Sequence, residues 1–240
     1  MSEQQQPVAR AAREPLTRRA ILDEAIAAID EEGLAALTMR SLGARLGVEA
    51  MALYRYVNGR EDLLEGVVDT LVDGIRVPQE RGLGPADGWQ AYLQWLAHSV
   101  RQVAVDHPAI FPLVATRHPA APWLRPPLRS LRVVEEFLSA LTRRGFSDAH
   151  AVEAYRVFTS FLLGHLLLEA SAAGADTGPP EEPLDEGDAD VPPAARGATE
   201  VSDYPTLART ADLLAQDHTR AEFEAALEAL LDRLDMVISQ

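Results

Sequence analysis

Arginine and tyrosine residues gather in and near one short stretch of the sequence, where their side chains suit a phosphate backbone and the edges of bases. The stretch GVEAMALYRYV, residues 47–57, holds Tyr54, Arg55 and Tyr56, and Arg40 lies shortly before it. Arginine reaches guanine or phosphate, tyrosine hydroxyls suit phosphate oxygens, and apolar groups such as the Met51 side chain meet the methyl group of thymine. These residue types indicate a surface that binds nucleic acid.

The overall charge first argues against such a partner, because a net charge of −15 repels a polyanion. The acids are unevenly distributed, however. Residues 1–77 carry 9 arginines against 13 acids, a net charge of −4, and residues 78–240 carry 13 against 24, a net charge of −11. Residues 33–60 hold four arginines (Arg40, Arg45, Arg55, Arg60) and one acid, Glu49, so this window has a net charge of +3. A local basic patch therefore remains inside an acidic chain.

Apolar residues recur at helical spacing along the chain and predict an all-α protein. The expected helices are residues 17–32, 38–46, 49–57, 60–75, 89–106, 128–144, 148–173, 204–216 and 219–238. Thr17 and Thr38 are expected N-caps, and Gly33 and Gly47 are expected to end the first two helices. Nothing alternates convincingly as a strand, and the segment 107–127 is punctuated by proline.

Composition divides the chain into three parts. We expect a disordered arm at residues 1–16, a DNA-binding domain at 17–77, and a larger helical domain at 78–240 that contains a flexible acidic loop at 174–203. The loop has nine acids and one arginine and cannot bury enough apolar surface to order itself. The first 20 residues lack the apolar core of a signal peptide and cysteine is absent, so we expect a cytoplasmic protein that does not enter a membrane.

The first four expected helices predict a helix-turn-helix, in which the second helix of the pair enters the DNA major groove. At 100° per residue, Ala50, Leu53 and Val57 share one face that packs on the preceding helix, and the opposite face displays Met51 and Arg55. The helix N-terminus behind Thr38 is expected to attract a phosphate. For Arg18 and Arg19, a solvated helix end and a phosphate contact are equally compatible with the sequence.

The segment LTMRSLGARLGVEAMALYRYVNGREDLL, residues 37–64, resembles the DNA-binding domain of tetracycline-repressor (TetR) family regulators, and the likeness covers about residues 16–75. The resemblance implies that Arg40 reads a base, that Tyr54 contacts phosphate, and that Arg60 is the basic residue that begins the fourth helix. Ala50 stands at a base-reading position that is often polar, so the operator sequence does not carry over. The DNA-binding residues expected are Thr38, Arg40, Ala50, Met51, Ala52, Tyr54, Arg55, Tyr56 and Arg60.

The second domain resembles the ligand-binding and dimerisation domain of the tetracycline repressors' own subgroup, through FPLVATR (residues 111–117), the acidic loop and FEAALEALLDRL (residues 223–234). Tetracycline-binding members carry a metal-ligating histidine shortly before TR, where this chain has Leu113, so we expect no metal and no other cofactor. The resemblance implies a small apolar or aromatic effector. The pocket residues expected are Trp89, Tyr92, Leu96, Phe111, Leu113, Thr116, Trp123, Val134, Phe137, Leu138, Tyr155, Phe158 and His165.

Several of these assignments have an open alternative. Single aromatic residues on helical stripes more often form core than line a pocket, although the group could still line a cavity, and His165 is equally compatible with a core position and with ligand contact. The terminal helix either packs in the core or pairs with a second copy, and the resemblance favours a four-helix interface between two copies. The interface residues expected are Phe161, Leu162, Glu169, Phe223, Leu227, Leu230 and Leu234.

Signatures of catalysis and of metal binding are absent from the sequence. It has no Gly-x-Ser-x-Gly and no phosphate-binding Gly-x-x-x-x-Gly-Lys, and its six histidines lack the spacing of a metal site. We therefore expect a homodimeric regulator rather than an enzyme. It would repress transcription from a palindromic operator and release it when a small molecule binds. The alternative is a helical sensor or interaction module that does not bind DNA.

Overall fold

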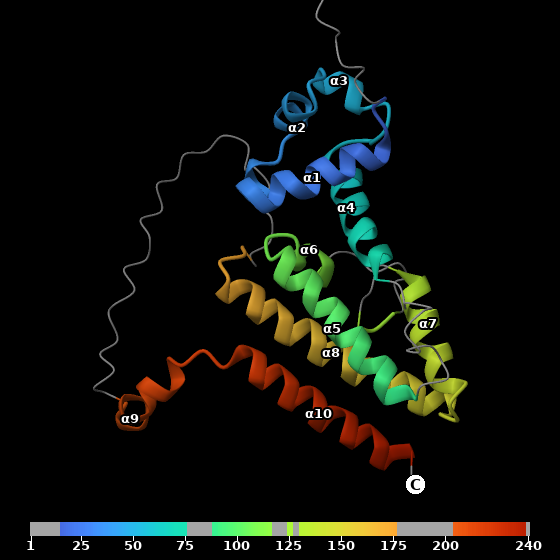
Figure 1. The fold of residues 1–240 in the computed structure, drawn as a ribbon, viewed down its shortest axis with the longest axis vertical. Helices are drawn as coiled ribbons and strands as arrows, with labels where there is room; N and C mark the ends of the chain where they lie inside the picture. Colours follow the sequence, from blue (N-terminus) through green and yellow to red (C-terminus); the bar gives the residue numbers. More distant parts are fainter. Residues whose placement is uncertain (1–14, 76–87, 117–123, 127–129, 177–203, 239–240) are drawn as a thin grey trace, which may run out of the picture. The chain divides into compact units, whose positions relative to one another are not determined.

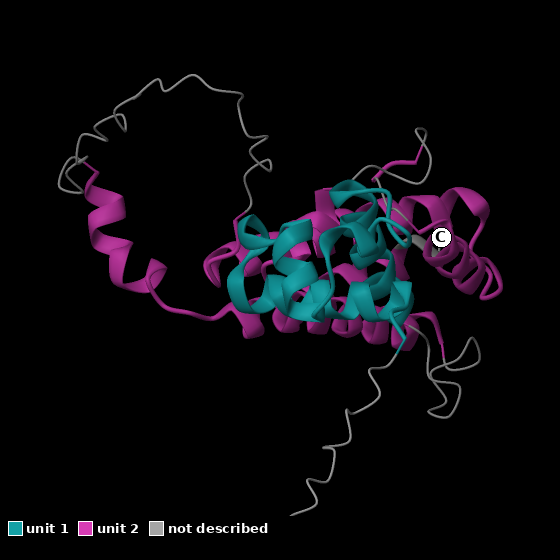
Figure 2. Cartoon of the chain, turned by 90° about the horizontal axis from the view of Figure 1, so that it is seen from above, with its two compact units in different colours: residues 1–74 teal, residues 75–240 magenta. Residues whose placement is uncertain are grey.

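The computed structural model describes residues 15–75, 88–116, 124–126, 130–176 and 204–238, and these residues are helical with no strand among them (Figure 1). The chain divides into two compact units, residues 1–74 and 75–240, coloured separately in Figure 2. The sequence had placed this boundary after residue 77. The expected arm at 1–16 lies almost wholly outside the described residues, as do Arg117, Trp123 and the loop from 177 onward.

Four α-helices and one 3₁₀ turn make up unit 1 from residue 15 onward. They are α1 (Arg18–Glu32), η1 (Leu34–Ala36), α2 (Met39–Leu46), α3 (Ala50–Leu53) and α4 (Arg60–Gly74). The expected caps are confirmed: the side chain of Thr17 accepts from the Ala20 amide, that of Thr38 accepts from the Ser41 amide, and Gly33 and Gly47 end α1 and α2 at positive φ.

The third helix is shorter than the expected 49–57, and this prediction was wrong beyond Leu53. From Tyr54 to Tyr56 the chain forms a turn, in which the Tyr56 amide donates to the Leu53 carbonyl at 2.9 Å. Tyrosine is a modest helix former, and the carbonyl of Tyr56 accepts from the Arg18 guanidinium instead of continuing the helix. The turn directs the chain into α4.

Apolar residues from all four α-helices form the core of unit 1. Its fully buried members are Ile21, Ala25, Ile29, Leu42, Leu53, Leu63, Leu64, Val67 and Val68. Leu53 and Val57 are only 0% and 1% exposed, as the face analysis predicted. They fix α3 and the turn that follows it on the rest of the unit.

Unit 2 contains α5 (Trp89–Asp106), α6 (Phe111–Thr116), α7 (Leu131–Thr142), α8 (Asp148–Ala172), α9 (Pro205–Leu214) and α10 (Thr219–Ile238). The sequence predicted five of these six helices and missed α6, which lies in the proline-punctuated segment. Pro112 occupies the second position of α6, where its missing N–H breaks no helical hydrogen bond.

Helix α8 is central to unit 2, because it packs against α5, α6, α7 and α10 (Figure 1). It is the one described helix that is long and apolar enough to span a membrane by length and composition alone, and 39% of its most apolar window is buried in the unit. The helices around it bury Phe158, Leu162 and Leu166, whereas Val157 and Leu168 remain exposed. Helix α9 is different, since none of its residues is buried.

Candidate functional site

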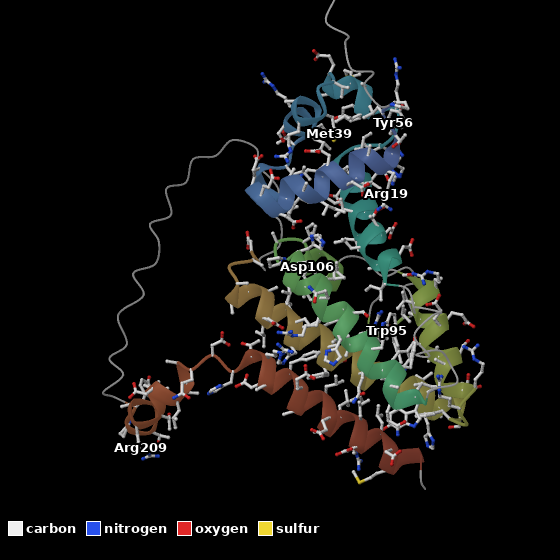
Figure 3. All side chains as sticks on the ribbon, viewed as in Figure 1. Arg19, Met39, Tyr56, Trp95, Asp106 and Arg209 are labelled. Carbon is white, nitrogen blue, oxygen red and sulfur yellow. The ribbon has the colours of Figure 1, made fainter. Side chains whose placement is uncertain are left out.

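The expected recognition residues of α3 and the following turn are exposed. Met51 is 75% exposed, Tyr54 47% and Tyr56 38%, whereas Ala50 and Ala52 are half-buried. Tyr56 is labelled in Figure 3. Arg40, in the first turn of α2, and Arg55 are exposed as well. Among the described residues, neither arginine has a hydrogen-bond or ion-pair partner within the chain. These side chains are therefore available to a partner molecule.

The other arginines of unit 1 that the structure describes are paired within the unit. The guanidinium of Arg45 lies between three carboxylates of α1. Its Nε is 2.6 Å from Glu24, its Nη2 is 2.8 Å from Glu31, and its Nη1 is 2.8 Å from Glu32. Hydrogen bonds, above all that to Glu24, raise the pKa of Arg45 further above its usual value. Arg45 is thus a structural link between α2 and α1.

Arg60 and Arg18 link other elements. Arg60 donates to the carbonyls of Leu34 and Leu37 at 3.2 and 3.4 Å, so it ties the beginning of α4 to the segment before α2. Arg18 donates to Asp62 at 2.9 Å and to the Tyr56 carbonyl at 3.2 Å. Arg18 is thereby held within the unit, and its side chain is 43% exposed, which is compatible with a solvated helix end. Arg19 pairs with Asp23 on its own helix.

Thr38, expected near a phosphate, forms a capping box with Ser41 at the beginning of α2. The Thr38 side chain accepts from the Ser41 amide at 3.0 Å, and the Ser41 hydroxyl accepts from the Thr38 amide at 2.9 Å. Both residues are thereby fixed at the beginning of the helix that carries Arg40.

The turn between α2 and α3 is tight, and glycine makes it possible. Gly47 is in the left-handed region at φ 66°, and the Val48 amide donates to the Gly43 carbonyl at 2.9 Å. A Cβ atom added at Gly43 would lie 2.9 Å from the Val48 carbonyl oxygen. The close approach of the two helices holds Met51 and Arg40 on adjoining elements.

In unit 2, the expected pocket residues that the structure describes lie mostly in the core. The Phe137 ring is 6.5 Å from Tyr92, 5.7 Å from Tyr155 and 5.5 Å from Phe158, measured between centroids. Burial raises the pKa of both tyrosines to about 12. Buried with them are Trp89, Leu96, Phe111, Leu113 and Val134, while Leu138 is half-buried and Thr116 is exposed.

His165 belongs to a second aromatic cluster, formed with Phe161 and Phe223, in which no described ring contacts the Phe137 ring. Its ring packs against Phe161 and Phe223 at 5.8 and 5.4 Å, and its buried Nε2 has no hydrogen-bond partner among the described residues. Leu113 stands on α6, with Thr116 donating to the carbonyl of Pro112. No group of three or more metal-ligating side chains occurs in the part of the chain that the structure describes.

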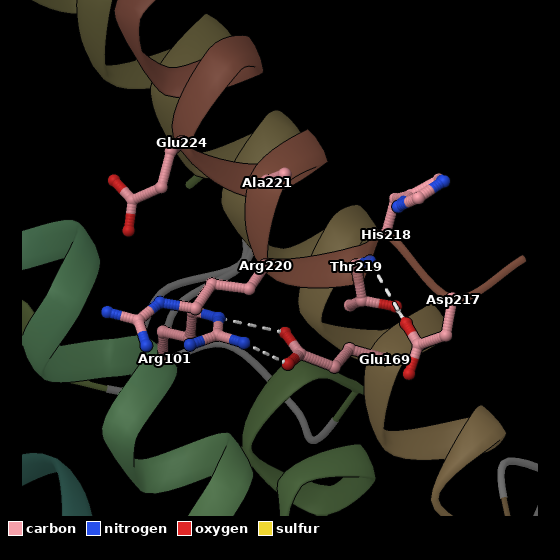
Figure 4. A pocket seen from close by; sticks show the side chains of 8 residues that line it. All are labelled: Arg101, Glu169, Asp217, His218, Thr219, Arg220, Ala221 and Glu224. Atoms are coloured by element: carbon pink, nitrogen blue, oxygen red, sulfur yellow. Dashed lines mark hydrogen bonds and ion pairs between the residues drawn. The ribbon is translucent and has the colours of Figure 1, made fainter.

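An open pocket lies beside the second cluster, at the beginning of α10 (Figure 4). At its base Arg101 of α5 donates to Glu169 of α8 through two hydrogen bonds of 3.2 and 2.5 Å, and the Arg101 guanidinium lies over the Phe223 ring. The sequence assigned Glu169 to the dimer interface and gave Arg101 no role, because a partner 68 residues away leaves no local pattern.

The other residues expected at the dimer interface are mainly internal to the unit. Phe223, Leu227, Leu234 and Leu162 are each at most 4% exposed, and they pack α10 on α5 and α8. Phe161 and Leu230 are half-buried against the same core. Three large apolar side chains that are exposed on these two helices are Val157, Leu168 and Met236. A partner helix would meet these side chains first.

Two protein families match the chain. The family described as bacterial regulatory proteins, tetR family, matches residues 21–67, which include most of unit 1. The tetracyclin repressor-like C-terminal domain matches residues 81–238, which include nearly all of unit 2.

Named relatives of the chain are transcriptional regulators too, in agreement with the two matching families. A helix-turn-helix transcriptional regulator of Saccharopolyspora erythraea is 30% identical over 65% of this chain and 61% of its own length. The transcriptional repressor DrrR1 of Streptomyces coeruleorubidus is 31% identical over 62% of this chain and 52% of its own length. The class D tetracycline repressor of Escherichia coli is 29% identical over 78% and 80% of the two chains. The chain thus spans little more than half the length of the first two relatives.

Solved structures share the fold along most of the chain. A possible TetR family transcriptional regulator from Streptomyces coelicolor has a TM-score of 0.68 at 31% identity, covering 92% of this chain and 99% of its own. ActR from the same organism, in complex with actinorhodin, has a TM-score of 0.66 at 22% identity, covering 95% and 100%. The second likeness concerns the fold alone.

Proposed function

Because this chain belongs to the TetR family of bacterial regulatory proteins, we propose that it is a ligand-responsive transcriptional regulator. It acts as a repressor and binds a palindromic operator through unit 1. The observation that carries this proposal is that the arginines described in unit 1 fall into a group with partners inside the unit and a group without. Arg18, Arg45 and Arg60 hold the helices together, while Arg40 and Arg55 remain exposed beside Met51, Tyr54 and Tyr56. A structural three-helix core alone would not require exposed tyrosines and unpaired cations on adjoining elements.

The binding mode follows from the chemistry of these groups. Arg40 is suited to a guanine edge or a phosphate, Arg55 to phosphate, and the hydroxyls of Tyr54 and Tyr56 to phosphate oxygens. Arg60 would contact DNA only with hydrogens that its two carbonyl partners leave free. One reading helix covers few base pairs, so two copies on half-sites about 34 Å apart supply the affinity.

We assign dimerisation to α8 and α10 of unit 2. Val157, Gly164 and Leu168 recur at helical spacing along one stripe of α8, and the two large residues are 43% and 74% exposed. Met236 of α10 is 53% exposed. A second copy packed on this stripe would remove these apolar surfaces from water. The residues expected from the sequence, such as Phe223, then support the interface from inside.

We assign effector binding to unit 2 as well, as ActR is known in complex with actinorhodin and shares the fold. The aromatic cluster around Phe137 favours a small apolar or aromatic molecule, without a metal or other cofactor. The rings are in contact, so binding requires them to part, and a ligand shifts the operator-binding equilibrium only if it prefers one state. The family function also favours a non-enzymatic protein in the cytoplasm.

The proposal is tested by gel-shift titration of the full chain against the DNA upstream of its own gene. Arg40→Ala and Tyr54→Ala are expected to weaken binding, because each removes an exposed group without breaking a described contact. Arg209→Ala, an exposed arginine of α9, removes the same charge and is expected to bind as the parent chain does. Undiminished affinity in both unit 1 variants would overturn the assignment of this surface, and the absence of a shift with the parent chain would favour the sensor without DNA binding.

A further inference from the structure

Met51 is the most exposed large apolar residue in the described part of unit 1, and it stands in the first turn of α3 between two alanines. No polar side-chain atom is present at Ala50, Met51 or Ala52. We propose that Met51 is a specificity-determining residue that selects an A·T pair in each operator half-site by contacting the C5-methyl group of thymine. The inference rests on the proposed function and names what this part of its DNA-binding surface recognises.

The position of Met51 follows from how α3 is held. Leu53 and Val57 anchor the segment in the core, and the tight turn at Gly43 fixes the beginning of α3 against α2. In a helix-turn-helix the N-terminal residues of the second helix contact base edges, whereas the first helix crosses the backbone. Met51 is the second residue of α3 and points away from the core, so it is the side chain that enters the groove.

The chemistry of the groove then restricts the base. In the major groove, thymine alone presents a methyl group, beside its O4 acceptor, while guanine, cytosine and adenine present hydrogen-bond donors or acceptors without a methyl group. A thioether side chain packed against such a polar edge removes its water and supplies no replacement hydrogen bond, which is unfavourable. Packed against a methyl group, it buries apolar surface on both partners. Met51 therefore favours thymine and disfavours each of the other bases.

The side chains near Met51 are not suited to contact the thymine methyl group. Arg40 and Arg55 carry charge, and Tyr54 carries a hydroxyl, so each satisfies a polar group of DNA. Ala50 and Ala52 are half-buried and too short to reach far into the groove. The preference for thymine therefore depends on one side chain, which a single substitution can remove.

The test begins with selection of binding sequences by the full chain from a randomised duplex library. The enriched duplex is then synthesised with thymine and, in parallel, with deoxyuridine, which lacks only the methyl group. For the parent chain, deoxyuridine is expected to weaken binding about fourfold for each methyl group contacted, hence about 16-fold for two half-sites. Met51→Ala is expected to bind both duplexes equally, and Met51→Leu to restore most of the difference.

Tyr54→Phe is the matched control, because it removes a phosphate contact and is expected to weaken binding to both duplexes by the same factor. Equal binding of the thymine and deoxyuridine duplexes by the parent chain, or an unchanged ratio in Met51→Ala, would overturn the inference while operator binding stands. Failure of the library to enrich any sequence would instead overturn the proposed function. Met51 is exposed, so thermal unfolding of its variants should match that of the parent chain.

Discussion

Arg45 Nε of α2 lies 2.6 Å from Glu24 Oε1 of α1, and this ion pair joins the helix that carries Arg40 to the helix that supports it. The same guanidinium reaches Glu31 and Glu32, each at 2.8 Å. Three carboxylates gather around one cation, which is 24% exposed as a side chain. Without that cation the three acids would repel one another.

Arg45→Gln is therefore expected to loosen the contact between α1 and α2. Hydrogen exchange in peptides from these helices should become faster, and the thermal midpoint of unit 1 should fall. Arg40→Gln makes the same chemical change on an exposed residue of the same helix, and it should lower operator affinity without altering exchange. Identical exchange in the two variants would show that the three ion pairs do not hold α2.

Gly43→Ala is expected to distort the turn between α2 and α3. The new Cβ would lie 2.9 Å from the Val48 carbonyl and 3.2 Å from the Ala50 amide nitrogen, and backbone atoms cannot move aside as a flexible side chain can. Overpacking of this kind costs about 1–3 kcal/mol, more than the helix propensity gained. Urea unfolding measures the loss.

Gly74→Ala is the control for that substitution, since no atom lies within 4 Å of its new Cβ and the residue ends α4. Its stability should stay level or rise by up to about 1 kcal/mol. A Gly43→Ala protein as stable as Gly74→Ala would mean that the turn tolerates a wider spacing than the structure has.

The salt dependence of operator binding reports how many phosphates the arginines neutralise. Each neutralised phosphate contributes about 0.9 to the slope of log affinity against log salt. Arg55→Ala should thus lower the slope by about 1.8 for two copies of the chain. Arg209→Ala should leave it unchanged. A slope that Arg55→Ala does not alter would remove Arg55 from the phosphate contacts.

Tyr92 is expected to make the stability of unit 2 fall as the pH rises through the alkaline range. Burial, with a smaller contribution from the Glu136 charge, raises its pKa from 10.0 to about 12. The raised pKa means that the folded state holds the phenol proton more tightly than the unfolded chain. The associated stability is complete below pH 10 and is lost as the pH rises from 10 towards 12.

Thermal unfolding of the parent chain and of Tyr92→Phe between pH 8 and 12 checks this expectation. The variant should lose less stability than the parent chain over the upper part of that range. Tyr54→Phe, an exposed tyrosine in unit 1, should follow the parent curve. Parallel curves for all three proteins would contradict a buried, protonated Tyr92.

Local features of the structure could be predicted from the sequence, because their causes are local. Thr17, Thr38, Gly33 and Gly47 act as caps through atoms a few residues away. The apolar residues at helical spacing in 89–106 predicted both ends of α5 correctly. The third helix was predicted too long. Its end depends on a hydrogen bond from Arg18, 38 residues earlier, which no periodicity contains.

The candidate site was predictable only in part for the same reason. Exposure of Met51 and burial of Leu53 follow from helical geometry, whereas the roles of Arg45 and Arg60 depend on partners 21 and 26 residues away. The +3 charge of residues 33–60 counted both of them as available cations. In unit 2 the sequence found the aromatic residues, but only packing showed that His165 and Phe137 belong to different clusters.

The internal use of Arg18, Arg45 and Arg60 has a physiological consequence. Among the described arginines of unit 1 it leaves Arg40 and Arg55 for the operator, so two copies that neutralise four phosphates with them would have a salt slope of about 3.6. When bacteria accumulate potassium during osmotic upshift, each doubling of its concentration would then weaken the operator complex about 12-fold. Osmolarity would thereby act on the regulated promoter alongside the effector.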